Sequence, residues 1–365
     1  MAKTYRDLFP AVRDFSALYA AYRRARRGKR HLPEVLRFEQ NLEGELFALQ
    51  DELDAGTYAT GPYHTFTVHE PKPRLIAALP FRDRVLQHSL IATLEPLWEP
   101  SFIPHSYACR PGRGLHQGLA QAHAWLRRLM HQHPGRPIYA LRTDISSYFA
   151  SVDHAVLNRQ LARRIACPRT LFLCEGILAA WPQGLPIGNL TSQLWANIHL
   201  HDLDLFAKHQ LRVRYYARYM DDCLLLHPDK ARLQAWQAAI AKWLSATLHL
   251  SLNRKSQVFP VAGTGPTGQG RALDWLGFRL WPTHRRLRRS SVIRMRRHLK
   301  ALASAYHQGL ISLERVRATV SSFTGHALHA DAWRITSQLL YQAPLIAPLS
   351  PQANASQPQN NLRNP

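Results

Sequence analysis

The chain has 365 residues, of which 46% are hydrophobic, so it is long enough for two or three domains or one larger enzyme with subdomains. Its 47 Lys and Arg against 24 Asp and Glu give a net charge of +23, which favours a polyanionic partner such as nucleic acid. No apolar run reaches membrane-spanning length, no secretory signal is recognisable, and the four cysteines lack CxxC spacing. We therefore expect free thiols, a cytoplasmic location and no membrane partner.

The first third of the chain predicts helices and one pair of strands. Apolar residues recur every three or four positions from Glu34, which predicts one amphipathic helix that ends at Gly56. The basic run over 23–30 is either a segment that binds RNA or an accessory protein, or a solvated surface. Further along, the pattern predicts a strand pair over 63–79 and helices over 80–94 and 115–130.

Three aspartates stand at strand ends in the middle of the chain. A strand over 138–143 ends in Asp144, and two further strands flank the adjacent pair Asp221 and Asp222. Adjacent carboxylates repel and Asp is poor in strands, so the pair is either an ordinary turn or part of a cation site. With Asp144 on a neighbouring strand, the three could hold two Mg²⁺ ions, which prefer hard oxygen ligands. Helices are predicted over 153–165 and 171–180, from 191, and over 229–248.

The last third predicts a flexible connection, a short strand pair and basic helices. The segment 261–270 is Gly-rich but lacks the Lys-Ser/Thr ending of a phosphate loop. The sequence LDWLGFRLW (273–281) predicts the strand pair, and 285–300 carries eight Lys and Arg with no acidic residue. The element order as a whole predicts an α+β fold in which helices back one mixed sheet.

The aspartates belong to a longer set of motifs that resembles one family. YMDD between two strands resembles the catalytic hairpin of reverse transcriptases, and DISSYF resembles their first catalytic strand. PKPRLIAALPFRDRVLQ resembles their fingers segment, GLPIGNLTSQLWANIHLHDLD the segment beneath the template–nucleotide pair, and LDWLGFRLW the primer grip. The resemblance implies RNA-directed DNA synthesis from dNTPs on an RNA template with a DNA or RNA primer, assisted by two Mg²⁺ ions for which Mn²⁺ can substitute.

The same resemblance implies a right-hand polymerase with fingers, palm and thumb. The palm sheet is expected to be mixed or antiparallel and backed by helices. The implied divisions are an N-terminal helical extension (1–60), fingers with part of the palm entry (61–137), a palm with the catalytic aspartates and primer grip (138–284), a helical thumb (285–343) and a disordered tail (344–365).

Roles for individual residues also follow from the resemblance. The metal ligands would be Asp144, Asp221, Asp222 and the backbone carbonyl of Ile145. Lys255 would protonate the departing pyrophosphate as a general acid. The plain alternatives are cap and turn residues for the aspartates and a surface charge for the lysine.

A second group of residues would contact the nucleotide. Phe149 would act as a steric gate against the ribose 2′-OH, with a core aromatic as the alternative. Lys72 and Arg74 would contact the triphosphate, with Arg82 or Arg84 able to share the task and a solvated surface charge as the alternative.

One departure from the family pattern indicates a subtype. Ile187 stands where Gln is usual and Gln193 where Pro is usual, which, with YMDD, resembles enzymes of diversity-generating retroelements. Both residues would shape the nucleotide pocket, and loss of an amide there would lower fidelity. A small basic accessory protein at the N-terminal region or thumb and a structured template RNA would then be partners, in a bacterium or phage. Retron, phage-defence and small group II intron-type enzymes, and an inactive RNA-binding scaffold, remain alternatives.

The basic segment before the tail carries the predicted duplex contacts. An apolar stripe on a helix would leave the basic side chains on other faces, where they follow a nucleic-acid backbone without sequence preference. These residues are Arg294, Arg296, Arg297 and Lys300.

Overall fold

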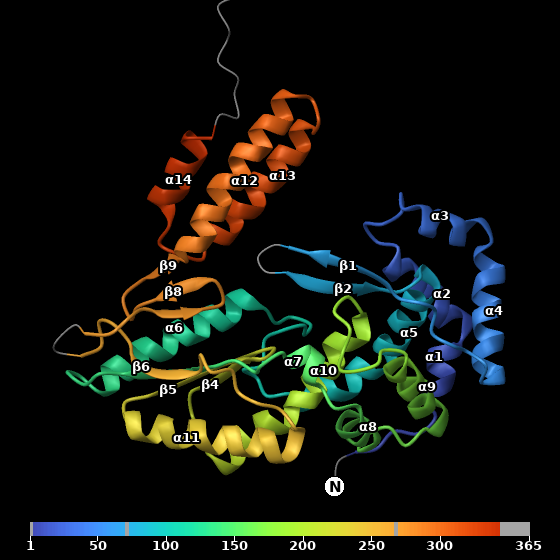
Figure 1. Ribbon diagram of the computed structural model, residues 1–365, viewed down its shortest axis with the longest axis horizontal. Coiled ribbons are helices and arrows are strands. Elements are labelled where there is room, and N and C mark those ends of the chain that lie inside the picture. The colour runs from blue at the N-terminus through green and yellow to red at the C-terminus, as the bar shows by residue number, and fades with distance from the viewer. Residues whose placement is uncertain (1–2, 70–72, 266–268, 344–365) are drawn as a thin grey trace, which may run out of the picture. The chain divides into compact units, whose positions relative to one another are not determined.

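The computed structural model describes residues 3–69, 73–265 and 269–343, and these form two compact units, Met1–Gly270 and Arg271–Pro365 (Figure 1). The boundary between the units lies inside the stretch 138–284, for which the sequence predicts a palm. The predicted tail lies outside the described residues, as does Lys72. Within the described ranges, no helix combines the length and apolar character that crossing a membrane requires.

Four helices open the first unit, and they correct one prediction. The single helix predicted from Glu34 to Gly56 is wrong, because Asn41 with φ −134° and ψ 49° separates two helices. Asn competes for backbone hydrogen bonds and so favours helix ends over helix interiors. Gly56 ends the second helix as predicted, with φ of 70°. The helices are α1 (Phe9–Arg13), α2 (Phe15–Ala25), α3 (Pro33–Gln40) and α4 (Leu42–Ala55).

The predicted strand pair and the two helices after it are present. Strands β1 (His64–Val68) and β2 (Arg74–Ala78) pair antiparallel. Helix α5 (Phe81–Trp98) runs four residues past the predicted end, since Trp98 is buried in the core like the residues before it. The short 3-10 turn η1 (Glu99–Ser101) and helix α6 (Leu115–Gln132) follow.

The central sheet has the order β4–β5–β3–β6, and every pair of neighbours in it is antiparallel. Alternate residues such as Leu141 and Leu225 point into the main core, which α10 and α11 supply on that face. Helix α6 lies on the opposite side (Figure 1). The α+β class is confirmed, with an antiparallel sheet. The strands are β3 (Tyr139–Thr143), β4 (Tyr216–Tyr219), β5 (Asp222–His227) and β6 (Gln257–Pro260).

Helices of the central region begin close to where the sequence predicts them. Asp153 caps one of them, and its carboxylate accepts the N–H of Val156 at 3.1 Å. Asp229 caps another in the same way. The elements are α7 (Tyr148–Ser151), α8 (His154–Ala162), α9 (Pro168–Ala179), α10 (Leu190–Leu205), α11 (Lys230–Trp243), and the π-helical turns η2 (Phe206–Gln210) and η3 (Leu244–Leu248).

The second unit places a small sheet before three helices. The predicted strand pair is present, and a third strand extends it over the start of the basic segment, where the sequence predicts helix. Buried Trp275 and Phe278 form the centre of this sheet. The elements are β7 (Leu273–Trp275), β8 (Phe278–Leu280), β9 (Arg285–Leu287), α12 (Arg289–His307), α13 (Leu313–Ala327) and α14 (Trp333–Tyr341).

Candidate active site

The hairpin between β4 and β5 has a tight, strained turn. Tyr219 pairs with Asp222, which leaves Met220 and Asp221 as the two turn residues. Met220 has φ of 56°, a left-handed conformation that two-residue hairpins favour and that glycine usually provides. A residue with a side chain in this conformation costs roughly 1–2 kcal/mol. Contacts around the turn must therefore hold it.

Asp144 lies next to this hairpin because β3 pairs with β5. The register Thr143–Cys223 places Asp144 beside the start of β5. The carbonyl of Asp144 accepts the backbone N–H of Asn253 at 2.7 Å, and its N–H donates to Ser256 Oγ at 3.3 Å. The Asn253 side-chain amide also donates to Asp144 Oδ2 at 3.2 Å. Three atoms of a distant segment thus hold Asp144, and one of them bonds its carboxylate.

Asp144 and Asp221 form the electrostatically strained part of the site. Burial, and then the neighbouring Asp144 carboxylate, raise the pKa of Asp221 to about 6. Two close carboxylates in a partly desolvated place favour either a shared proton or a cation. The hard oxygen donors suit Mg²⁺, which uses one or two carboxylates and completes its shell with water and phosphates.

Asp222 points to a different partner. Arg142 on β3 donates to both of its carboxylate oxygens, from Nε at 3.1 Å and from Nη2 at 2.8 Å. Within the described ranges, no three His, Cys, Asp or Glu side chains are grouped so as to hold a metal ion. The structure therefore brings Asp144 and Asp221 together and places Asp222 in an ion pair beside them.

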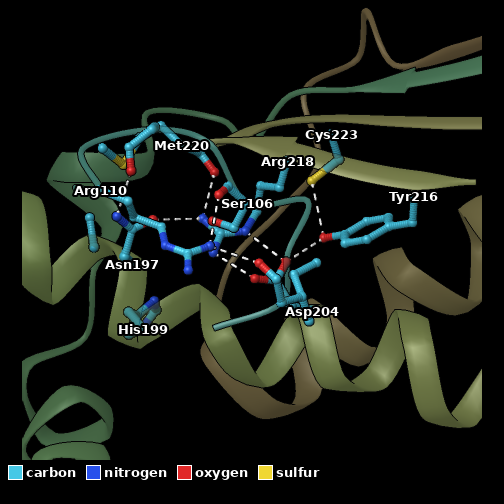
Figure 2. A network of polar contacts seen from close by, with 12 residues as sticks. Ser106, Arg110, Asn197, His199, Asp204, Tyr216, Arg218, Met220 and Cys223 are labelled. Carbon is cyan, nitrogen blue, oxygen red and sulfur yellow. Dashed lines mark hydrogen bonds and ion pairs between the residues drawn. The ribbon is translucent and has the colours of Figure 1, made fainter. Parts of the chain in front are cut away.

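A fully buried ion pair supports the hairpin from the other face of the sheet (Figure 2). Arg218 on β4 donates to Asp204 on α10 through Nε and Nη2, each at 2.7 Å, and both side chains are 0% exposed. Its Nη1 donates to Asn197 Oδ1 at 3.2 Å and to the Met220 carbonyl at 3.0 Å. Tyr216 Oη donates to Asp204 Oδ1 at 2.8 Å. Although burial lowers the pKa of Arg218, the Asp204 carboxylate outweighs this effect and raises it, so the guanidinium stays charged.

The loop after α5 borders the same strand. The Arg218 N–H donates to the His105 carbonyl at 2.9 Å, and the Tyr107 N–H donates to the Arg218 carbonyl at 3.0 Å. Arg110 holds this loop by donating to two of its carbonyls and to the carboxylate of Glu99. Hydrogen bonds thus hold the main chain of Arg218 as well as its side chain.

Comparison with known proteins assigns this hairpin to a family. Residues 68–280, more than half of the chain, match the family described as reverse transcriptase (RNA-dependent DNA polymerase). The chain belongs to the reverse transcriptase family. The match includes all three predicted aspartates and ends in β8. It confirms the family and the enzyme class, an RNA-directed DNA polymerase, that YMDD and DISSYF predict.

Individual relatives are distant. Protein YkfC of Escherichia coli (strain K12) is 27% identical over 62% of this chain and 70% of its own length. The group II intron-encoded protein LtrA of Lactococcus lactis subsp. cremoris is 27% identical over 47% of this chain. The match spans 30% of LtrA. An uncharacterized mitochondrial protein of Marchantia polymorpha, ymf11, is 32% identical over 36% of this chain and 17% of its own length.

The predicted nucleotide-pocket residues lie on two neighbouring segments of the first unit. The Ile187 carbonyl accepts the N–H of Ala77 on β2 at 2.8 Å. Gly188 follows with φ of 128°, and a Cβ there would stand 2.5 Å from the Ala77 carbonyl oxygen, so a side chain is excluded. Ile187 is half-buried, whereas Gln193 is exposed on α10. The loop therefore docks its main chain on β2 and leaves the Ile187 side chain partly accessible.

Phe149 is partly buried against the main core. Its ring meets Tyr148 edge-on, with centroids 5.6 Å apart, and its carbonyl accepts the N–H of Leu185 at 2.6 Å. This position is compatible with both interpretations, the steric gate and the core aromatic.

The predicted phosphate contacts differ in how free they are. Arg74 is exposed at the start of β2. Arg82 and Arg84, the alternatives, form ion pairs with Glu52 and Glu34. These pairs connect α5 to α4 and α3, so we assign both arginines a structural contact.

The remaining predicted residues lie at the site's border or in the second unit. Lys255 is exposed, and its N–H donates to Asn253 Oδ1 at 3.0 Å. Ile145 is buried and forms an isolated antiparallel bridge with Leu252. Leu299 and Leu302, which belong to the predicted apolar stripe of α12, are buried. The four predicted basic contact residues of α12 are all exposed: Arg294, Arg296, Arg297 and Lys300.

Sequence reasoning missed four residues around the aspartates. Arg142 has the clearest signal, because it stands two residues before Asp144 and therefore on the same face of the strand. Arg218 precedes YMDD in a strand that is otherwise apolar or aromatic, which marks a charge that needs a buried partner. Asn253 and Asp204 give no comparable signal, since their partners are more than ten residues away.

Proposed function

We propose that this chain joins a primer 3′-OH to the α-phosphate of a dNTP on an RNA template, with divalent cations held by Asp144 and Asp221. The observation that carries the proposal is the close pair of carboxylates at the end of β3 and the β4–β5 turn, inside the family match. Asp222 and the carbonyl of Ile145 are further candidate ligands. Bound Mg²⁺, or Mn²⁺ in its place, would activate the attacking hydroxyl and stabilise the leaving oxygen.

The chain's own residues would then bind and orient the reactants. Asn253 and Ser256 fix Asp144, so that its carboxylate is oriented before substrate arrives. Exposed Arg74 would contact the triphosphate, and Phe149 would exclude a ribose 2′-OH. Exposed Lys255 would donate a proton to the leaving pyrophosphate. Lys72, proposed beside Arg74, lies outside the described residues.

The exposed basic side chains of α12 would hold the duplex. The four exposed side chains share one helix, and the positive charge that they place there suits affinity for a phosphate backbone. A hybrid of RNA and DNA is recognised chiefly by shape and by its backbone. Binding should therefore weaken steeply with salt and depend little on template sequence. The residues are Arg294, Arg296, Arg297 and Lys300.

The test of the core proposal is Mg²⁺-dependent primer extension on a mixed-sequence RNA template. Asp144→Asn and Asp221→Asn should each abolish product. Asp229→Asn is the matched control, since it makes the same chemical change at the cap of α11. Wild-type levels of product from the Asp221→Asn variant would contradict the proposal. Activity on DNA templates but not on RNA templates would contradict the proposed use of an RNA template.

We further propose the diversity-generating subtype, in which cDNA is copied from a template-repeat RNA with errors at adenines. Ile187 and Gln193 support it, together with the partly accessible Ile187 side chain near β2. A structured template RNA and a small basic accessory protein at the N-terminal region or thumb would be the partners. Sequencing of every cDNA from wild type and Ile187→Gln tests this. Errors that are rare, or equal opposite all four bases, would count against it.

A second candidate is a small group II intron-type enzyme, and the match to LtrA favours it. Such an enzyme would copy its template with few errors. The same cDNA sequencing separates the two candidates, because accurate product opposite adenines supports the intron type and concentrated adenine errors support the diversity-generating type.

A further inference from the structure

The turn residue Asp221 is connected through one peptide group to the buried Arg218. The Met220 carbonyl, which accepts from Arg218 Nη1 at 3.0 Å, belongs to the peptide that joins Met220 to Asp221. A peptide is planar, so a fixed carbonyl oxygen also fixes the N–H and Cα of the next residue. The orientation of this oxygen therefore sets the position of the Asp221 Cα, from which the carboxylate leaves the turn.

The guanidinium can orient this carbonyl because its other edge is already held. Nε and Nη2 form two bonds to Asp204, each at 2.7 Å, and Asn197 Oδ1 accepts a further bond from Nη1. Together with the bond to the Met220 carbonyl, these use four of the five N–H groups of the planar guanidinium (Figure 2). A lysine ammonium is a point charge on a flexible stem and cannot fix two directions at once.

Stability alone does not account for such a pair. A buried ion pair is often no more stabilising than apolar side chains of similar volume, because both charges lose their hydration. The same residues do reach a strained position, since Met220 has φ of 56°. The strand that carries Arg218 is also held along its main chain by His105 and Tyr107.

We propose that Arg218 and Asp204 form a positioning pair, which holds the Met220–Asp221 peptide in the orientation that aims the Asp221 carboxylate at Asp144. The pair does not touch substrate. It acts from the covered face of the sheet, opposite the face that carries Arg142 and Asp144. This inference rests on the proposed role of Asp221 as a metal ligand.

The experiment compares folded variants of the full chain in single-nucleotide extension. Arg218→Gln with Asp204→Asn removes both buried charges at once and keeps an acceptor for Tyr216 Oη. Its shorter amide cannot bond position 204 and the Met220 carbonyl together. Tyr216→Phe is the matched control, because it removes one hydrogen bond to Asp204 and leaves the bond to Met220 in place. Melting temperature, kcat and the KM for dNTP are measured for each.

We expect the double variant to melt near the wild-type temperature with kcat at least about tenfold lower and a KM that changes little, since the defect is the aim of a ligand. Tyr216→Phe should keep wild-type kcat. A folded double variant with wild-type kcat would overturn the proposal. If it does not fold, Arg218→Lys decides, because it keeps the charge and loses the fork: unchanged kcat overturns the proposal, and reduced kcat at constant KM supports it.

Asp221→Asn in the same assay separates this inference from the proposed function. If Asp221→Asn is active, both the proposed metal-ligand role of Asp221 and the positioning role of Arg218 and Asp204 are rejected. An inactive Asp221→Asn protein beside a fully active double variant overturns the positioning role alone.

Discussion

Two arginine–aspartate pairs flank the β4–β5 turn, one on each face of the sheet. Arg142 and Asp222, the open pair, lie on the α6 side of the sheet with side chains 35% and 18% exposed, whereas Arg218 and Asp204, the covered pair, lie on the opposite side with both at 0%. Each pair has two hydrogen bonds of similar length. Water can replace the partners of the first pair but cannot reach those of the second. The two pairs have similar hydrogen-bond geometry, so their difference in solvent exposure determines the free energy lost when each pair is broken.

The largest effect is expected when the covered pair loses one partner. Asp204→Ala would leave the Arg218 charge buried and unpaired, which typically costs about 3–5 kcal/mol. Urea unfolding followed by circular dichroism measures it. Asp54→Ala on α4 is the control, since Asp54 and its partner Arg13 are 40% and 33% exposed, and it should cost below about 1 kcal/mol. Equal losses for the two variants would mean that burial does not separate the pairs.

Removing the charge of Asp221, which lies between the two pairs, should stabilise the fold, whereas removing Asp204 should destabilise it. Because burial and Asp144 raise the pKa of Asp221 to about 6, its charge destabilises the metal-free fold at pH 7. Asp221→Asn in EDTA should stabilise the protein by roughly 1–2 kcal/mol after allowance for solvent screening, while abolishing extension.

The sign of this effect fixes its pH dependence. The folded state binds the Asp221 proton more tightly than the unfolded chain, so the wild type gains stability as pH falls through about 6. The advantage of Asp221→Asn should therefore shrink between neutral pH and pH near 4 in EDTA. An advantage that grows on acidification would show that the carboxylate is not under strain.

The open pair should contribute little to stability. Arg142→Gln removes a partly solvated ion pair and should cost below about 1 kcal/mol in the same urea titration. Added salt should reduce even this difference. A loss as large as that of Asp204→Ala would erase the distinction between the two faces.

The smallest effect is expected at the turn residue itself. Both Met220→Gly and Met220→Ala lose the packing of the Met220 side chain on the core. Glycine also relieves the left-handed strain but adds freedom to the unfolded chain, so Met220→Gly should be more stable than Met220→Ala by up to about 1 kcal/mol. Identical melting temperatures for the two would mean that φ at this position carries no strain.

The ordering of local elements was accessible from sequence because it depends on neighbours in the chain. Short apolar runs predicted the strands before Asp144 and around YMDD, and the helix predicted from residue 153 begins at the cap residue Asp153. The single helix predicted from Glu34 to Gly56 was wrong because Asn41 interrupts it, although the apolar spacing continues past this residue.

The aspartates themselves were named from the sequence, and the motif match placed them in the reverse transcriptase family. Sequence reasoning alone therefore identified which side chains are candidates and on which strand ends they lie. Their partners required the tertiary structure. Arg142 meets Asp222 across 80 residues, and Asn253 meets Asp144 across 109. Only folding decided that Asp222 faces an arginine and that Arg218 is buried, because strand register and burial arise from pairing segments that lie far apart in the chain.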